Sequence, residues 1–205
     1  MPVTLKDRLE LGDEFHFPAS WNEFLDMLEV CEYRIEYDED EIISFMGYAT
    51  ELHEKLMLKI GALLLAVLND DLFNVYGSNL ALHIPGFKYK YYNADCAVIK
   101  GKSERVTLRG EMTAIANPIL LVEVLSASTK DHDLGRKFRN YRKIPALQQI
   151  LFIESTEKLV VSHTRQDRTQ WLLSEYSSDD DLIPILSEGS IRLGDLYKKI
   201  EFEEV

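Results

Sequence analysis

The segment 119–125 constrains the fold more than any other part of this 205-residue chain. It is apolar throughout except for one carboxylate, Glu123. A run of this kind is typical of a central strand that is buried on both faces of a sheet. Burying an unpaired carboxylate there costs on the order of several kcal/mol. Glu123 therefore needs a cation, a hydrogen-bond donor or a proton.

Residue patterns on either side of this strand predict a mixture of helices and strands. A capping box at Ser20-Trp21-Asn22-Glu23 begins a helix that runs to about Val30, and helical spacing of apolar residues predicts a longer helix at 50–69 that packs on a sheet. Short β-rich segments predict further strands at 72–75, 79–84, 94–99, 149–153, 159–164 and 170–175. A basic helix at about 131–143 lies between two strands, as in a crossover unit, and a short helix is expected near 194–200.

Two alternating segments, 33–37 and 41–46, predict an antiparallel hairpin with one face in solvent. The acidic run Asp38-Glu39-Asp40 joins them, and we interpret it as a solvated turn. The aromatic and basic residues at 87–92 alternate in the same way. They could stack on bases, but a second hairpin with its tyrosines packed on the scaffold is the interpretation we favour.

Composition limits the class of protein. With 35 acidic and 23 basic residues the net charge is −12, which argues against non-specific nucleic-acid binding. The charge is uneven, because residues 61–150 hold 8 acids and 12 bases. No apolar run approaches the roughly 18 residues that span a bilayer, so no membrane partner is expected. Cys31 and Cys96 lack metal-ligand spacing and indicate reduced thiols of a cytoplasmic protein.

Asp95 begins a predicted strand, and Glu123 lies in another. If the two strands pair, both carboxylates could hold one divalent ion, with a backbone carbonyl and waters as further ligands. The alternative is structural: Glu123 forms a salt bridge with a basic residue, and Asp95 caps a turn. The spacing alone leaves both open.

The basic helix offers a third charged group. On a regular helix Leu134, Phe138 and Tyr141 form the buried face, and Lys137 lies at its margin, where its ammonium could reach the strand that carries Glu123. The outward residues are suited to phosphates, although an ordinary solvated face is the alternative. These outward residues are Arg136, Arg139, Arg142 and Lys143, and Lys88 and Lys90 are further candidates for nucleic-acid binding.

His53 points toward the core side of the helix at 50–69. A lone histidine on an apolar face is usually a satisfied core residue. Its place one turn from the helix start would also allow it to line a cleft, so we keep it as a second-tier site residue.

Three segments together resemble a known family. Asn93-Ala94-Asp95-Cys96-Ala97-Val98, Leu121-Val122-Glu123-Val124-Leu125-Ser126-Ala127-Ser128-Thr129, and Asp133-Leu134-Gly135-Arg136-Lys137 with Tyr141 are similar to the Uma-two family of bacterial restriction endonucleases, within the PD-(D/E)XK nuclease superfamily. The resemblance extends over about 33–164.

The resemblance implies an α/β (α+β) fold in which helices flank a mixed restriction-endonuclease-like sheet. Chain length and the lack of a linker or repeat predict one domain over 1–205. We divide it into an N-terminal helix and hairpin at 15–48, a nuclease-like core at 49–155, and C-terminal strands and a short helix at 156–205. The resemblance also implies Mg²⁺ or Mn²⁺ on Asp95, Glu123 and the Val124 carbonyl, with Lys137 as the catalytic lysine. The usual lysine position is taken by Leu125.

The implied activity is metal-dependent hydrolysis of DNA phosphodiester bonds, with His53 orienting a phosphate or ligand at the edge of the site. A homodimer is the expected assembly for cutting both strands. One alternative is an inactive nuclease fold that binds nucleic acid or protein, which the charge of −12 and the displaced lysine favour. Another is a two-carboxylate sugar hydrolase, which requires an open cleft between Asp95 and Glu123.

Overall fold

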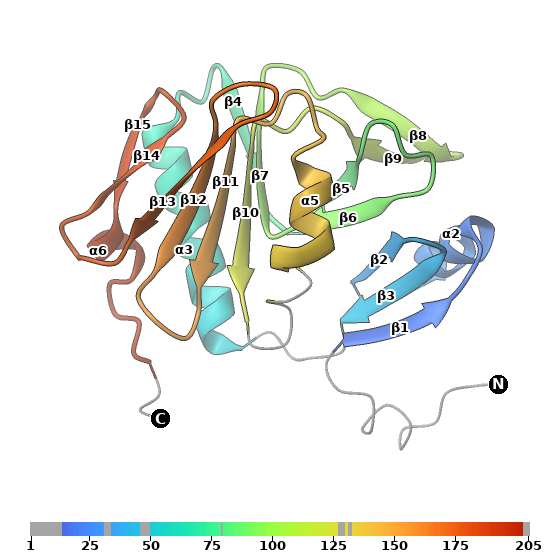
Figure 1. Cartoon of the computed structure of the whole chain (residues 1–205), viewed down its shortest axis with the longest axis horizontal. Coiled ribbons are helices and arrows are strands. Elements are labelled where there is room, and N and C mark those ends of the chain that lie inside the picture. The colour runs from blue at the N-terminus through green and yellow to red at the C-terminus, as the bar shows by residue number, and fades with distance from the viewer. Residues whose placement is uncertain are drawn as a thin grey trace.

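Two mixed sheets form most of the fold (Figure 1). The computed structural model of the chain describes residues 14–30, 34–45, 50–78, 80–126, 130 and 133–202. The expectations for Cys31, for the motif residues 127–129 and for residues 131–132 lie outside these ranges. The seven-stranded sheet has the order β1 (Glu14–Pro18), β3 (Glu41–Phe45), β2 (Ile35–Asp38), β6 (Tyr91–Ala94), β5 (Leu80–His83), β9 (Met112–Ile115) and β8 (Arg105–Arg109).

The six-stranded sheet contains most of the apolar segment 119–125. Its order is β13 (Trp171–Tyr176), β12 (Val160–Arg165), β11 (Gln149–Glu154), β10 (Leu120–Leu125), β7 (Cys96–Lys100) and β4 (Phe73–Tyr76). Strand β10 is central, pairs in parallel with β11 and antiparallel with β7, and is buried along its whole length. The chain crosses from β10 to β11 through η1 (Asp133–Lys137) and α5 (Phe138–Tyr141). The central strand and the crossover are both confirmed.

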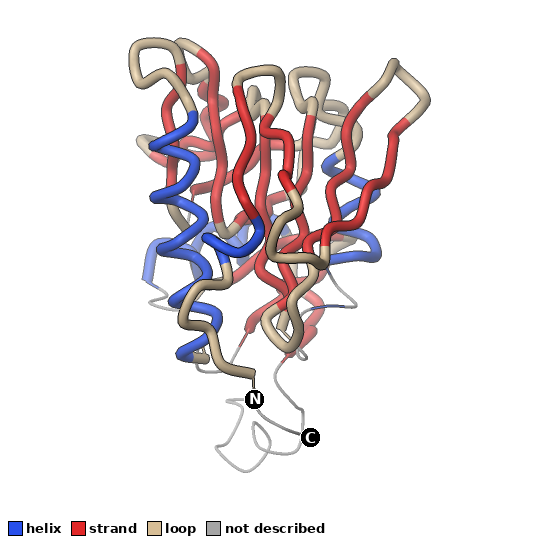
Figure 2. The backbone as a smooth tube through the Cα atoms, turned by 90° about the vertical axis from the view of Figure 1, so that its left-hand side faces the viewer, coloured by secondary structure: helices blue, strands red, loops and turns tan. Residues whose placement is uncertain are grey.

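Helix α3 (Glu51–Val67) covers one face of the six-stranded sheet, and in Figure 2 it stands alongside the strands. Its residues Leu56, Ile60 and Leu64 share one apolar core with β10 and with the C-terminal elements. These are the hairpin β14 (Leu182–Ile185) and β15 (Gly189–Arg192) and the short helix α6 (Leu193–Leu196). Gly189 allows close packing there, since a Cβ on it would lie 2.9 Å from Val67 Cγ1. The expectation that α3 packs on a sheet is confirmed.

A second apolar core lies on the opposite face of β10. Tyr141 and Ile144 pack there against Leu121, Leu125 and Phe152. Both faces of β10 are therefore covered, which is the reason that its sequence is almost entirely apolar.

Helix α2 (Trp21–Val30) begins at the capping box expected from the sequence. The Ser20 N–H donates to Glu23 Oε2 (2.7 Å), and the Glu23 N–H donates to Ser20 Oγ (3.3 Å). The helix buries Phe24 and Leu25 in a third core with Tyr37. This α2 core packs against the hairpin of β2 and β3.

The hairpin differs from its prediction in one respect. Its turn, Glu39 and Asp40, has positive φ values of 51° and 62°, as two-residue hairpin turns require. The prediction that one face of the hairpin is in solvent is wrong, however, because all four residues of β2 are buried. Asp38 is buried as well, so only Glu39 and Asp40 form the solvated turn. The polar face of β2 meets other charged groups instead of water.

The basic helix also differs from its prediction. The helix is interrupted at Gly135, whose φ of −89° and ψ of −110° are not helical, and α5 ends at Tyr141. The change of helical geometry rotates the buried face. Leu134, expected in the core, is 39% exposed, whereas Lys137, expected at the margin, is only 1% exposed.

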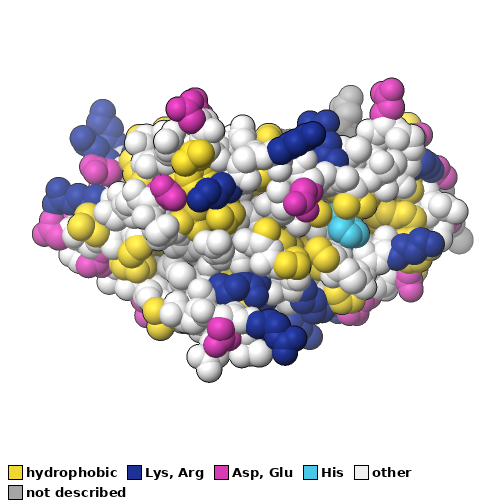
Figure 3. All heavy atoms as spheres, turned by 90° about the horizontal axis from the view of Figure 1, so that it is seen from above, with side chains coloured by type: hydrophobic (Ala, Val, Ile, Leu, Met, Phe, Trp, Pro, Cys, Tyr) yellow, Lys and Arg dark blue, Asp and Glu magenta, His cyan; other side chains and the backbone are white. Residues whose placement is uncertain are grey.

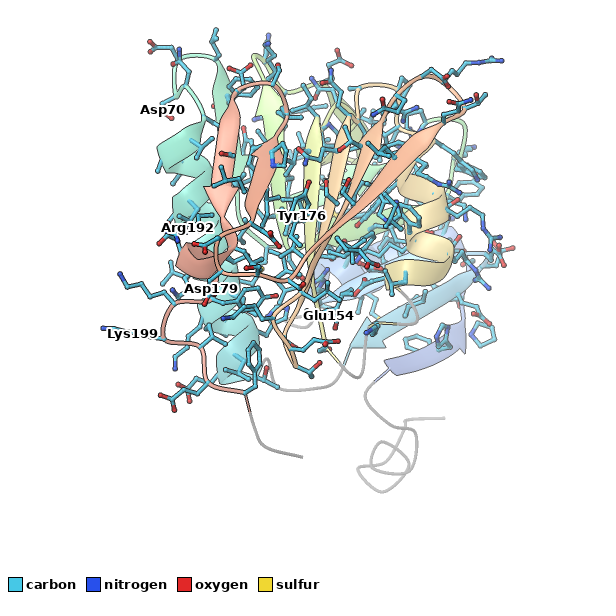
Figure 4. All side chains as sticks on the ribbon, turned by 60° about the vertical axis from the view of Figure 1, so that its left-hand side comes forward. Asp70, Glu154, Tyr176, Asp179, Arg192 and Lys199 are labelled. Atoms are coloured by element: carbon cyan, nitrogen blue, oxygen red, sulfur yellow. The ribbon has the colours of Figure 1, made fainter. Side chains whose placement is uncertain are left out.

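The C-terminal part is held by hydrogen bonds from side chains to main-chain carbonyls. Arg192 Nε donates to the carbonyl of Asp179 (3.1 Å), and both residues are labelled beside α6 in Figure 4. The hydroxyl of Tyr197 donates to the carbonyl of Glu154 (2.8 Å). Helix α6 is shorter than the predicted helix at 194–200.

Strands β1, β8, β9, β14 and β15 were not predicted from the sequence. Among the described residues, no helix is both long and apolar enough to cross a membrane.

Candidate active site

Asp95 lies where the chain leaves β6 of one sheet and enters β7 of the other. Its N–H donates to the Val122 carbonyl (3.1 Å), and its Oδ2 accepts from the Val124 N–H (2.8 Å). The carboxylate thus takes the place of a ladder partner at the point where β7 begins. Both the main chain and the side chain of Asp95 are therefore bonded to β10, next to Glu123.

Glu123 projects from β10 toward the face that α5 covers, because alternate residues of a strand face the same side as Leu121 and Leu125. Its side chain is 1% exposed. The Tyr141 hydroxyl donates to Glu123 Oε1 (2.7 Å). Within the part of the chain that the structure describes, Glu123 Oε2 accepts no hydrogen bond. The Tyr141 hydroxyl of α5 therefore fixes Oε1, whereas the lone pairs of Oε2 are not used by any hydrogen bond among the described residues.

Lys137 joins this cluster from η1. Its ammonium lies 3.0 Å from Glu123 Oε1, 3.1 Å from Glu36 Oε1 and 3.0 Å from Asp133 Oδ1. Three carboxylates from β10, β2 and η1 share one buried cation. The structure thus brings Lys137 to the strand that carries Glu123, deeper than the sequence predicts.

His53 reaches the same cluster from the first turn of α3. The ring atom Nε2 lies 3.4 Å from Asp95 Oδ2. The main-chain N–H of His53 donates to Oγ1 of the N-cap residue Thr50 (3.2 Å). Burial alone would lower the pKa of His53, but the hydrogen bond and the charge of Asp95 raise it above its ordinary value. His53 therefore contacts Asp95, the carboxylate expected to hold a metal ion.

Two further residues of the cluster, Arg34 and Glu36, were missed in the sequence analysis. Arg34 Nη1 donates to Asp95 Oδ1 (2.7 Å), and Nη2 lies 3.9 Å from Glu123 Oε2. Glu36 Oε1 accepts from the Asn93 N–H (3.0 Å). The alternation of residues 34 and 36 at the start of the hairpin was the available signal, because it places both on one face. We assigned that face to solvent, whereas it lies against the site.

The charges determine the protonation of the buried groups. Burial would raise the pKa of Asp95, but Arg34 and His53 hold it well below its ordinary range. Burial would lower the pKa of Lys137, but Asp133, Glu123 and Glu36 raise it. Burial raises the pKa of Glu123 well above its ordinary value, against the opposing charge of Lys137. The site thus already holds two permanent cations, Arg34 and Lys137, among its carboxylates.

The donor set matches a divalent cation in its chemistry. Asp95, Glu123 and the Val124 carbonyl offer hard oxygen ligands, which Mg²⁺ and Mn²⁺ prefer. The Val124 carbonyl faces the same edge of β10 as the Val124 N–H, which is bonded to Asp95. Glu123 Oε2 is a buried acceptor without a donor among the described residues. Those residues contain no group of three or more His, Cys, Asp or Glu arranged to hold a metal. The residues fit the ion if Arg34 releases Asp95 Oδ1.

A neighbouring buried cluster corrects one of the DNA-binding predictions. Lys90 is buried and forms an ion pair with Asp38, whose Oδ2 also accepts from the Tyr92 hydroxyl (2.5 Å). Asn140 Nδ2 donates to the same hydroxyl (2.7 Å). Lys90 is therefore part of the scaffold and is not accessible to DNA. The tyrosines Tyr91 and Tyr92 are buried as well, in agreement with the scaffold interpretation of 87–92.

The other predicted basic residues are exposed. They are Lys88, Arg136, Arg139, Arg142 and Lys143. Arg136 pairs with Glu39 on the hairpin turn (3.2 Å), and Arg142 lies over the Phe138 ring. Figure 3, a view of the end of the sheets where β10 begins, shows basic and acidic side chains interspersed. On that end, basic charge is not concentrated in a single patch.

Comparisons with known proteins agree with this fold. The chain is 31% identical over 158 residues to the uncharacterised protein sll1609 of Synechocystis sp., covering 77% of this chain and 87% of that protein. It is 29% identical over 167 residues to the uncharacterised protein slr1290 of the same organism, covering 81% of this chain and 85% of that protein. A crystal structure titled as a putative nuclease belonging to DUF820, from Anabaena variabilis, has a TM-score of 0.68 at 19% identity, covering 88% of this chain and 98% of that one.

The solved structure shows that the fold is of the restriction-endonuclease-like class, as the sequence analysis expected. A family model described as "Putative restriction endonuclease" matches residues 21–191, which include every residue of the cluster described above. The chain therefore belongs to the Uma2 family.

Proposed function

We propose that this protein is a divalent-metal-dependent endonuclease that hydrolyses phosphodiester bonds in DNA. One observation carries the proposal: Asp95, Glu123 and Lys137 come from three separate elements and form one buried cluster, linked by Arg34. A fully buried lysine is rare unless its ammonium has a specific task or partner. The family description supports the same reaction.

Each residue has a distinct role in this proposal. Asp95, Glu123 and the Val124 carbonyl would hold Mg²⁺ or Mn²⁺. A bound divalent ion supplies activation of water and neutralisation of charge at the phosphorus. Lys137 orients Glu123 through Oε1 and adds positive potential where the phosphate becomes more negative. His53 positions Asp95 through Oδ2.

DNA contacts would come from the exposed basic residues of the crossover segment. Arg139 and Lys143 are exposed on α5 and just after it, and Arg142 lies between them. Such contacts attract phosphates through charge without reading sequence. Because the whole chain carries −12, we expect binding to be weak and salt-sensitive.

A second function, binding without cleavage, is favoured by one specific observation. Arg34 already neutralises Asp95, and among the described residues no three-ligand metal group is formed. An inactive nuclease fold that binds nucleic acid or protein would retain this arrangement as a purely structural ion-pair network.

Plasmid cleavage separates the two functions. We would incubate supercoiled DNA, and in parallel a structured RNA, with Mg²⁺ or Mn²⁺ and with wild type, Asp95→Asn, Glu123→Gln and Lys137→Met. The exposed Asp71→Asn serves as the matched control. Cleavage by wild type and the control, with a loss of roughly 10²-fold or more in the three site variants, supports the nuclease. Equal cleavage by all variants, or none with either metal, contradicts it.

We also propose a twofold homodimer as the form that cuts both strands, because a symmetric pair of sites faces two antiparallel strands. Light scattering after size-exclusion chromatography gives the mass of the assembly. A monomer that nonetheless converts supercoiled DNA directly to the linear form would contradict the dimer.

A further inference from the structure

Arg34 contacts both carboxylates that are proposed to hold the metal. Its Nη1 lies 2.7 Å from Asp95 Oδ1, and its Nη2 lies 3.9 Å from Glu123 Oε2. The same Nη2 is 3.6 Å from Glu36 Oε1 and bonds the Asn93 carbonyl. The guanidinium therefore lies between the oxygens that a metal ion would need.

We propose that Arg34 is an internal competitor of the divalent ion, a positioning residue whose guanidinium must leave Asp95 Oδ1 before the metal binds. The inference rests on the proposed metal site and deepens it, because it names the residue that regulates metal affinity. It concerns binding and requires no chemical step.

The two cations of the site are placed differently on Glu123. Lys137 approaches Oε1, which also accepts the Tyr141 hydroxyl, whereas Arg34 approaches Oε2. A metal ion on Oε2 can therefore coexist with Lys137 but competes with Arg34. Lys137 therefore stays paired with Glu123 when the metal binds, whereas Arg34 exchanges its place with the metal ion.

Burial supports the same division. The Arg34 side chain is 24% exposed, whereas that of Lys137 is 1% exposed, so only Arg34 has a path toward solvent. Without a cation near Asp95 and Glu123, two buried carboxylates would repel each other at high energetic cost. Arg34 offsets that repulsion in the metal-free protein, and a divalent ion offsets it in the metal-bound protein.

Direct metal binding to the full chain tests the inference. We would titrate Mn²⁺ into wild type, Arg34→Gln and Asp95→Asn and measure the dissociation constant by calorimetry. Arg109→Gln is the matched control, because Arg109 also pairs with carboxylates, those of Asp26 and Glu29, but outside this cluster. We expect Arg34→Gln to bind Mn²⁺ about tenfold more tightly than wild type, the control to be unchanged, and Asp95→Asn to lose binding.

The outcomes distinguish this inference from the proposed function. Equal or weaker Mn²⁺ binding by Arg34→Gln, with Asp95-dependent binding retained in wild type, overturns the competitor role and leaves the metal site standing. Absence of Asp95-dependent binding in both wild type and Arg34→Gln overturns both proposals.

A second measurement uses only the wild-type protein, in case Arg34→Gln does not fold. The Nε–H resonance of Arg34 is followed by NMR during titration with diamagnetic Mg²⁺. A shift that saturates with the metal supports displacement of the guanidinium. Saturation of the Asp95 and Val124 amide resonances with no change at Arg34 overturns it.

Discussion

The ammonium of Lys137 lies 3.0 Å from Glu123 Oε1, although one residue comes from a helical crossover and the other from the central strand. Neither group could be buried alone at tolerable cost, because each would lose its hydration without compensation. Their pairing explains how β10 accommodates a carboxylate among apolar residues. It also places a permanent positive charge beside the proposed metal ligands.

Replacing Lys137 should destabilise the protein strongly. Lys137→Met leaves Glu36, Glu123 and Asp133 without their shared cation, and breaking a buried ion pair costs about 3–5 kcal/mol of unfolding free energy. Urea denaturation followed by circular dichroism measures the loss. The exposed Lys143→Met, six residues further along, should change the unfolding free energy by less than about 0.5 kcal/mol. A loss for Lys137→Met as small as that expected for Lys143→Met would show that the Lys137 cluster is energetically unimportant.

The ion pair of Asp38 and Lys90 predicts that the adjacent residues Asp38 and Glu39 contribute very differently to the free energy of unfolding. Asp38 is fully buried, so Asp38→Asn should cost about 3 kcal/mol because Lys90 loses its counter-charge. Glu39 is 60% exposed and pairs with Arg136, so Glu39→Gln should cost less than about 1 kcal/mol. Both substitutions keep the shape of the side chain. Chemical denaturation measures the free energy of unfolding of the two variants. A loss of this free energy for Glu39→Gln as large as that for Asp38→Asn would refute the contrast.

Salt dependence tests the DNA-contacting role of the crossover segment. Arg139→Ala should weaken binding to a fluorescent duplex and reduce the slope of log K against log salt by about 0.9, the value for one phosphate contact. Fluorescence polarisation in the Asp95→Asn background, without metal, separates binding from cleavage. Lys158→Ala is the control, because Lys158 pairs with Asp179 in the C-terminal part. An unchanged slope for Arg139→Ala would exclude this residue from the DNA interface.

The hairpin between β12 and β13 should be sensitive to acid. Asp167 Oδ1 accepts hydrogen bonds from the N–H groups of Thr169 (2.7 Å) and Gln170 (2.9 Å), and these bonds lower the pKa of Asp167. A lowered folded pKa means that the stabilisation is present above the unfolded pKa of about 3.9 and is lost as the pH falls through the folded pKa.

Thermal unfolding at several pH values measures this contribution. Asp167→Asn should lower Tm at neutral pH, and the difference from wild type should shrink below about pH 4 as the wild-type carboxylate is protonated. Asp70→Asn, an exposed acid on another loop, controls for net charge. A Tm difference that stays constant from pH 7 to acid would contradict the role of the ionised form.

Much of the scaffold could be predicted from local patterns. The apolar run at 119–125 predicted a central strand, the capping box at Ser20 predicted the start of α2, and helical periodicity predicted α3. These signals are local, because they depend on the spacing of apolar side chains or on hydrogen bonds between residues three apart. The hairpins β8–β9 and β14–β15 were missed, although β8 alternates polar and apolar residues.

The candidate site could be predicted only in part. Asp95, Glu123 and Lys137 were found because a carboxylate in an apolar strand requires compensation and because their motifs resemble a known family. Arg34 and Glu36 were not found, since a charged face of a strand looks the same in sequence whether it meets water or other charges. Leu134 was placed in the core because a regular helix was assumed, and the break at Gly135 turned Leu134 outward while Tyr141 stayed buried.

The sequence by itself thus determined that Glu123 must have a partner, because an apolar strand cannot bury a bare carboxylate. Only the tertiary structure decided which partners it has. Lys137 and Tyr141 approach Oε1 from the crossover, and Arg34 approaches Oε2 from the position just before β2. That choice depends on how β2, β6, β10 and η1 meet in space, and residue spacing along a chain carries no information about the meeting of distant elements.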